Sequence, residues 1–274
     1  MIALYAFGVC LAPFAFPRPI EYKYIIVLGS QERRVLRGAE VMSVQAKQIF
    51  RYGVDFLMTL DVIALMAFSV TGQAVHEWLG VFAFVLFCVH VYLNKGWFAA
   101  LTRGKYPPYR VLQTALVFSL VCAMSAQMLS GAAMSRYAVA FLEIPLSSSA
   151  ARVVHLACAY WCFVLVSLHL GIHLGIFIGL GRKLFRQGRP LSPVGRAFLR
   201  LVAFALAAFG LYCFFALGIP DYMFLRSEFA FFDYDKPIFL ALFEVVSVLA
   251  LWTSIGYVLQ KAAVRLGKKS IARS

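Results

Sequence analysis

The chain has 274 residues, of which 62% are hydrophobic and 14% charged, and it carries a formal net charge of +14. Ordinary soluble domains contain about 25% charged residues, and one soluble core could not cover so much apolar surface. The basic residues gather in short segments between apolar stretches, not in a stripe interleaved with aromatics, which argues against nucleic-acid binding. Composition therefore predicts an integral membrane protein, with lipid as its main partner. The lack of alternating strand patterns predicts an all-α fold.

The first 50 residues combine an apolar segment, 1–16, with a basic segment, 18–51. Segment 1–16 lacks the basic start of a signal peptide. An interfacial helix, a short additional span and a retained anchor remain open for it. We expect the basic segment to lie along the cytoplasmic surface of the membrane.

Six apolar stretches follow, each about long enough to cross a hydrocarbon layer of roughly 30 Å as a helix. We predict these transmembrane helices at 54–72, 77–98, 110–134, 153–180, 197–219 and 237–260. The fold class is thus a polytopic all-α membrane protein. We divide it into a four-helix bundle (51–185), two further transmembrane helices (186–262) and a basic tail (263–274).

An internal repeat relates the first two predicted spans to the next two. The odd span of each half ends in a hydroxyl residue and a glycine, Thr71–Gly72 and Ser130–Gly131, and each even span carries two histidines. Two such helical hairpins make a four-helix bundle, a frame that holds cofactors between facing helices.

Charge patterning predicts the orientation. Basic clusters follow the second, fourth and sixth predicted spans, whereas the 219–236 segment carries Asp221, Glu228, Asp233 and Asp235. Segments rich in Lys and Arg face the cytoplasm. We therefore expect the N- and C-terminal basic regions in the cytoplasm and the protein in the inner (plasma) membrane of a bacterium.

Four histidines form two equally spaced pairs: His76 and His90 are 14 residues apart, and so are His155 and His169. Fourteen residues return a helix to within about 40° and advance it about 21 Å, so each pair shares a face and spans much of the membrane. The even spans run in the same direction, so His76 can face His155 and His90 can face His169. Each facing pair supplies the two axial imidazoles of a b-type haem. The pattern predicts two haem b groups with these four histidines as iron ligands.

Other residues are candidate accessories. His173, one turn after His169, could replace it, bond a haem propionate or contact a quinone. Gly80, one turn after His76, leaves room for a macrocycle, although close helix packing explains a small residue equally well. Arg136 and Arg152 are candidate propionate partners, and each could equally be a surface anchor.

Two acids stand out in the first predicted span. Asp61 lies near its middle and Asp55 near its cytoplasmic end. Carboxylates in lipid are by default functional, and a proton relay at Asp61 or a hydrogen bond to a histidine are candidate roles. Contact of Asp61 with water or with Gln113 or Gln127 is the structural alternative.

The segment HEWLGVFAFVLFCVHVYLNKGWF, from His76, resembles the signature span of the flavinylation-associated cytochromes, a cytochrome-b-like family of di-haem membrane proteins. The matching residues are His76, Gly80, His90, Leu93, Asn94 and Trp97. The segment from Phe229 to Lys261 also looks like the late loop and final span of that family. The resemblance covers about residues 50–262 and implies a cytochrome-b-like bundle that passes electrons to flavoproteins outside the cytoplasm.

The chain has no CxxCH haem-attachment motif, iron–sulfur cysteine cluster or dinucleotide fingerprint. We therefore expect an electron-transfer subunit of an oxidoreductase system rather than a stand-alone enzyme. It would link a cytoplasmic-side donor or quinol to an extracytoplasmic flavoprotein or other acceptor. The Tyr222–Tyr234 segment is a candidate dock, or an interfacial aromatic belt. A quinone-reactive anchor subunit and a haem-free proton-coupled transporter stay open as alternatives.

Overall fold

The computed structural model describes residues 30–186 and 191–271, and every regular element within them is a helix. The helices are α2 (Ser30–Met66), α3 (Phe68–Leu93), α4 (Lys95–Ala99), α5 (Pro108–Met134), α6 (Ser148–Arg186), α7 (Pro193–Ala216), α8 (Ile219–Met223) and α9 (Ile238–Ile271). The predicted all-α class is confirmed over this part of the chain. The apolar segment 1–16, the start of the basic segment 18–51 and the last residues of the basic tail lie outside the described residues.

Five of the described helices are long and apolar enough to cross a membrane. They are Phe68–Leu93, Pro108–Met134, Ser148–Arg182, Pro193–Ala216 and Ile238–Lys269. They correspond to the second through sixth predicted spans. Two have favourable first turns: α5 and α7 begin at prolines, and the Ser192 hydroxyl accepts a 3.0 Å hydrogen bond from the Gly195 amide at the start of α7.

The first predicted span, 54–72, does not form one helix. Helix α2 ends at Met66, and Ala67 separates it from α3. A second break follows at Gly72, whose φ of 68° and ψ of 171° interrupt α3. Glycine adopts this conformation without the steric cost of a Cβ atom. The chain therefore turns within residues 67–72, earlier than the apolar pattern predicts.

The chain forms two compact units. The first combines the residues up to Asp61 with Phe82–Thr102, and the second combines Val62–Val81 with the chain from Arg103 onward. In the first unit, the Arg51 guanidinium donates to the Leu93 carbonyl at 2.7 Å, which links the basic part of α2 to the end of α3.

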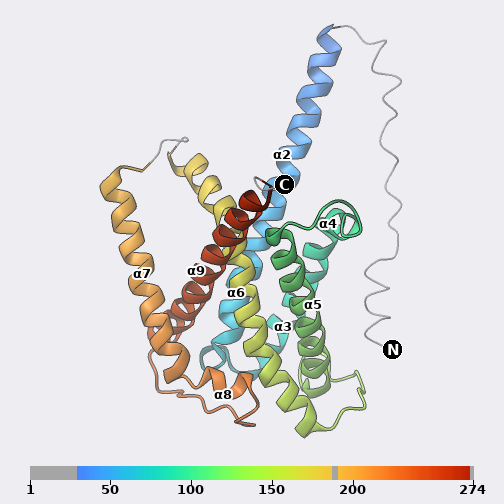
Figure 1. Cartoon of the computed structure of the whole chain (residues 1–274). Coiled ribbons are helices and arrows are strands. Elements are labelled where there is room, and N and C mark those ends of the chain that lie inside the picture. Colours follow the sequence, from blue (N-terminus) through green and yellow to red (C-terminus); the bar gives the residue numbers. More distant parts are fainter. Residues whose placement is uncertain (1–29, 187–190, 272–274) are drawn as a thin grey trace. The chain divides into compact units, whose positions relative to one another are not determined.

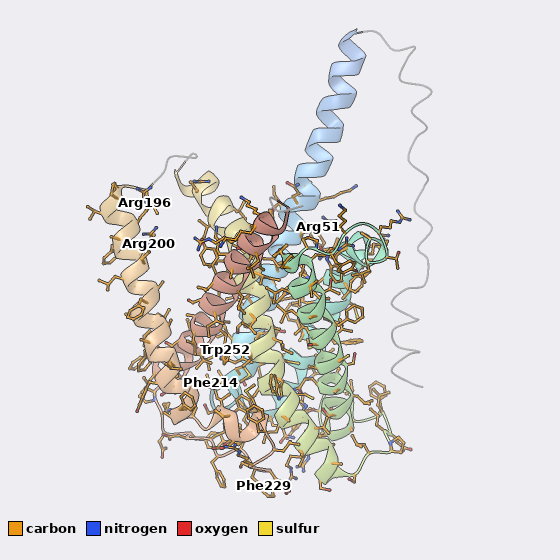
Figure 2. The ribbon with its side chains drawn as sticks, in the orientation of Figure 1. Arg51, Arg196, Arg200, Phe214, Phe229 and Trp252 are labelled. Carbon is orange, nitrogen blue, oxygen red and sulfur yellow. The ribbon has the colours of Figure 1, made fainter. Side chains whose placement is uncertain are left out.

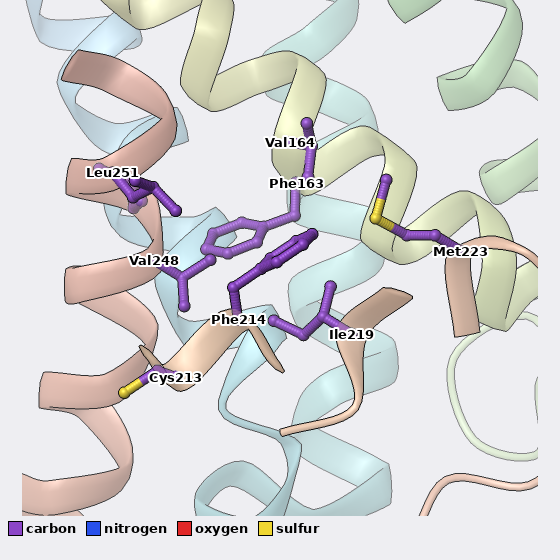
Figure 3. Packing of buried hydrophobic residues seen from close by; sticks show 9 residues of the cluster. Phe163, Val164, Cys213, Phe214, Ile219, Met223, Val248 and Leu251 are labelled. Atoms are coloured by element: carbon purple, nitrogen blue, oxygen red, sulfur yellow. The ribbon is translucent and has the colours of Figure 1, made fainter. Parts of the chain in front are cut away.

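The second unit is built around α6, which packs against both α5 and α9, while α7 packs against α9 (Figure 1). The short helix α8 packs on α6 and α7. Their shared core includes Phe163, Phe214, Met223 and Val248, which lie close together (Figure 3). Since helices from before and after the 187–190 segment share this core, α7 and α9 are integral to the unit that contains α6.

Glycines let the helices of this unit approach closely. A Cβ atom on Gly171 of α6 would collide with the α9 backbone at Thr253 and Gly256, and one on Gly210 of α7 would collide with the Ser247 backbone. Small residues at crossings allow such backbone contact between membrane helices. His169 and His173 are each two residues from Gly171, so helix periodicity places them on the side of α6 opposite this crossing.

Candidate functional site

His76 and His155 lie together in the second unit. His76 stands on α3 one turn after the Gly72 break, and His155 stands on the first part of α6. Their ring centroids are 6.2 Å apart, with an angle of 73° between the ring planes. The structure thus brings together two histidines that are 79 positions apart (155 − 76) and that the sequence predicts to face each other.

This spacing fits two axial ligands of one haem. An imidazole–metal bond is about 2 Å long and the ring nitrogen lies about 1 Å from the ring centre, so rings on opposite sides of one iron have centroids about 6 Å apart. His76 Nδ1 is buried and has no hydrogen-bond partner among the described residues. A Cβ atom on Gly80, one turn further along α3, would meet nothing within 4 Å. The ring spacing and the open position at Gly80 are what a bis-histidine haem would require.

Helix α5 sets the position of the His155 ring. Ser130 Oγ lies 3.5 Å from His155 Nδ1, and Gln127 Nε2 lies 3.2 Å from His155 Nε2. Gly131 leaves the space for the ring, because a Cβ atom there would be 3.1 Å from His155 Cε1. Iron ligation through Nε2 requires the Gln127 amide to move off that nitrogen, whereas Ser130 can hold Nδ1 in either state. Such partners fix the orientation of a ligating histidine.

Glu77, next to His76, binds the segment that follows α5. One carboxylate oxygen, Oε2, accepts hydrogen bonds from the Ser135 hydroxyl at 2.8 Å and from the amides of Arg136, Tyr137 and Ala138 at 3.0, 2.7 and 3.1 Å. Sequence reasoning did not single out Glu77, because its donors are mostly backbone groups about 60 positions away. The anchored segment carries Arg136 into the neighbourhood of the histidine pair.

The two candidate propionate partners are both exposed at the surface. Arg136 is held through its backbone by Glu77. The Arg152 guanidinium lies over the ring of Phe229, 5.3 Å from its centroid, so its described contact is with the 219–236 segment. The structure brings neither guanidinium into a described contact with a histidine.

A row of aromatic rings connects the histidine pair to the surface. The Phe68 ring lies 5.1 Å from that of His76 and 4.8 Å from that of Phe232, and Tyr234 follows at 6.4 Å from Phe232. Tyr234 is 67% exposed. The row exists because the break at Gly72 lets Phe68 contact a ring only eight positions further on. The predicted docking segment Tyr222–Tyr234 is thus in contact with the histidine pair through Phe68.

His90 has a carboxylate partner in the first unit. Its Nδ1 lies 2.7 Å from Asp55 Oδ1. Of the two roles considered for the acids of this segment, a hydrogen bond to a histidine is the one that Asp55 has in the structure. His90 belongs to the first compact unit and His169 to the second, so their pairing stays a prediction.

His169 and His173 are neighbours on successive turns of α6, with ring centroids 4.8 Å apart. Which of the two would ligate a haem stays a prediction. Among the described residues there is no group of three or more His, Cys, Asp or Glu side chains that could hold a metal ion.

Asp61 is buried, with 4% of its surface exposed, and neither carboxylate oxygen has a hydrogen-bond partner among the described residues. Of its two expected polar neighbours, Gln127 bonds His155 instead. Another acid in an apolar helix, Glu244, is paired: Lys236 Nζ donates to its carboxylate at 2.8 Å. Of these two acids in apolar helices, Asp61 is the one without a described hydrogen-bond partner.

No protein-family model, no curated protein and no solved structure matches this chain.

Proposed function

We propose that this chain is a transmembrane electron carrier in which His76 and His155 ligate a b-type haem. The observation that carries the proposal is the 6.2 Å distance between their ring centroids, on two different helices of one compact unit. Five helices are long and apolar enough to cross a membrane. This supports the proposal, because electron transfer across a lipid layer needs a cofactor held inside it.

Each described neighbour has a role in this site. His76 and His155 would hold the haem iron through their ring nitrogens, and Ser130, whose hydroxyl lies 3.5 Å from His155 Nδ1, would orient the His155 ring. Gly131 leaves room for that ring. Glu77 holds the segment after α5 beside the site. Haem iron between two imidazoles supplies reversible one-electron chemistry when bound.

We propose a second haem, ligated by His90 and by His169 or His173, on the basis of the equal spacing of the two histidine pairs. This is also what the resemblance to the flavinylation-associated cytochromes implies. Electrons would pass between a cytoplasmic-side donor or quinol and an extracytoplasmic flavoprotein or other acceptor. The basic segments would face the cytoplasm of a bacterium, and the Tyr222–Tyr234 segment would face outward.

The test is optical. We expect the detergent-purified full chain to show a reduced-minus-oxidised spectrum of b type, with about two haems per chain in a pyridine haemochrome assay. His76→Ala and His155→Ala should each remove one haem. Val154→Ala is the matched control, since Val154 neighbours His155 on α6 but is 38% exposed, and it should keep both haems. A colourless protein after expression with ample haem would overturn the proposal.

One observation favours a second candidate function. The buried, unpaired carboxylate of Asp61 is typical of a proton site in a transporter. A haem-free, proton-coupled transporter would be colourless and would lose proton-dependent uptake in Asp61→Asn. The haem assay therefore separates the two candidates before any substrate is known.

A further inference from the structure

The second unit separates its charges by sign along its helices. Every acid of this unit lies towards the end where α5 ends and α9 begins: Glu77, Glu143, Asp221, Glu228, Asp233, Asp235 and Glu244. Neither α5 nor the part of α9 beyond Glu244 contains an Asp or a Glu. The described residues of this unit at the opposite end, where α5 begins and α9 ends, therefore carry basic charges that no acid offsets.

A turn before α5 presents two of these basic side chains. Gly104 has a φ of 77°, which favours a residue without a Cβ atom. Arg110 Nη1 donates to the Arg103 carbonyl at 2.6 Å and to the Lys105 carbonyl at 3.1 Å. The Arg110 guanidinium also lies over the Tyr106 ring, 4.2 Å from its centroid. These contacts fix the turn against the first residues of α5, while the side chains of Arg103 and Lys105 are exposed.

The end of α9 brings further basic side chains to the same place. A Cβ atom on Gly267 would lie 3.6 Å from Pro108 Cδ and 3.8 Å from Pro107 Cβ. The last turns of α9 therefore lie against the start of α5 (Figure 1). The exposed basic residues on either side of Gly267 are Arg265, Lys268 and Lys269. Cations in a last turn also offset the helix dipole, but that effect does not account for the basic turn before α5.

We call the five exposed side chains of Arg103, Lys105, Arg265, Lys268 and Lys269 the basic surface. Exposed apolar side chains border it, Val111 on α5 and Leu266 on α9. Both helices are long and apolar enough to cross a membrane, so charges at their ends lie at the level of lipid headgroups. A soluble acidic protein would match the charges alone, whereas an anionic lipid matches both the charges and the apolar side chains beside them.

We propose that the basic surface binds the phosphate headgroup of an anionic phospholipid. Guanidinium and ammonium groups donate charge-assisted hydrogen bonds to phosphate oxygens. Basic pockets between membrane helices bind anionic headgroups in this way. The site lies at the opposite end of the unit from the loop that Glu77 binds beside His76, and it does not rest on the proposed electron-carrier function. In the proposed orientation it faces the leaflet that carries anionic lipids.

The experiment measures binding of an acyl-labelled phosphatidylglycerol to the detergent-purified full chain by fluorescence anisotropy, with labelled phosphatidylcholine for comparison. One variant, Arg103→Gln/Lys105→Gln, changes the turn before α5, and another, Lys268→Gln/Lys269→Gln, changes the end of α9. A basic residue near an anionic headgroup changes affinity about fivefold, so each pair should weaken phosphatidylglycerol binding roughly 25-fold. Binding of phosphatidylcholine should stay unchanged.

Arg196→Gln/Arg200→Gln is the matched control. It also removes two exposed charges from the start of a helix, α7 (Figure 2), and should bind phosphatidylglycerol as the native protein does. Equal weakening in this control would show a diffuse attraction to positive charge and would overturn the site. Weakening in only one of the other two variants would overturn a site shared by α5 and α9.

A second measurement uses the native protein. Raising the salt concentration from 0.1 M to 1 M shortens the screening length from about 10 Å to about 3 Å and should release phosphatidylglycerol; unchanged binding would overturn the charge basis. Inorganic phosphate should not displace the lipid, and displacement would reduce the site to one for free anions. Native lipid binding in both charge variants, together with lost binding to immobilised poly-glutamate, would assign the basic surface to an acidic protein and overturn the lipid site.

Discussion

Gly131 illustrates how one missing Cβ atom can define a site. The ring of His155 lies so close that a Cβ atom on Gly131 would be 3.1 Å from Cε1 and 3.3 Å from Nδ1. The preceding residue, Ser130, places its hydroxyl near the same ring. The sequence indicates the Ser-Gly pair only as the end of a repeated pattern. Whether this pair contacts a histidine ring depends on which face of α5 packs on α6.

Gly131→Val should therefore cost the protein one haem. The branched side chain would occupy the space of the His155 ring and push it out of line with His76, and the measurement is haem per chain. Gly179→Val is the control, because a Cβ atom at Gly179 meets nothing within 4 Å. Two haems in Gly131→Val would show that the ring position in the structure is not the ligating one.

Glu77 makes a second prediction at this scale. Glu77→Ala leaves the Ser135 hydroxyl and three amides without their acceptor, and should lower the stability of this segment by about 1–3 kcal/mol. Proteolysis within residues 135–147 should then be faster. Glu143→Ala, an exposed acid in the same segment, is the control and should leave the rate unchanged. Equal rates in both variants would contradict a structural role for Glu77.

At the scale of elements, the helix breaks at Ala67 and Gly72 and the crossing of α6 and α9 set how the helices are arranged. The pattern of apolar residues predicts a span at 54–72, but Ala67 and Gly72 interrupt it. Hydropathy measures only how apolar a stretch is, and a positive φ at one glycine is a backbone property that hydropathy does not report. The crossing of α6 and α9 was equally hidden, because a glycine in an apolar helix has several common roles.

Gly171→Val should separate α6 from α9. Its side chain would collide with the backbone of Thr253 and Gly256, which cannot rotate away as a side chain can. Overpacking typically costs about 1–3 kcal/mol, and a backbone collision should reach the upper end. Thermal unfolding in detergent measures the effect. Gly175→Val, where a Cβ atom meets nothing within 4 Å, should unfold close to the native protein; the same temperature for both variants would contradict the crossing.

At the scale of the whole chain, the second unit has two chemically different ends. Figure 2 shows Arg196 and Arg200 at one end of α7 and Phe229 at the opposite end of the unit. The Phe229 end carries exposed aromatics such as Phe231 and Tyr234, 87% and 67% exposed. Basic residues favour the cytoplasmic side and aromatics favour either interface, which is the physical basis of the proposed orientation.

Cysteine labelling checks this orientation. In a cysteine-free background, Ser227→Cys should react with a membrane-impermeant reagent in intact cells. Arg196→Cys should react only after the membrane is permeabilised. Arg196 lies in the first turn of α7 and Ser227 in the loop after α8, both outside the buried core, so accessibility reports the side of the membrane. The reverse pattern would show that the positive charges do not set the topology of this chain.

The sequence by itself determined the helical class, five of the membrane helices and the two equally spaced histidine pairs. These are properties of composition and of the 3.6-residue period, which act along a single helix and need no knowledge of its neighbours. Only the tertiary structure decided where α2 gives way to α3, that Ser130 and Gly131 hold His155, and that Asp55 bonds His90. Those contacts join residues 24 to 35 positions apart, and their distances depend on the rotation and register of packed helices, which hydrophobic periodicity leaves open.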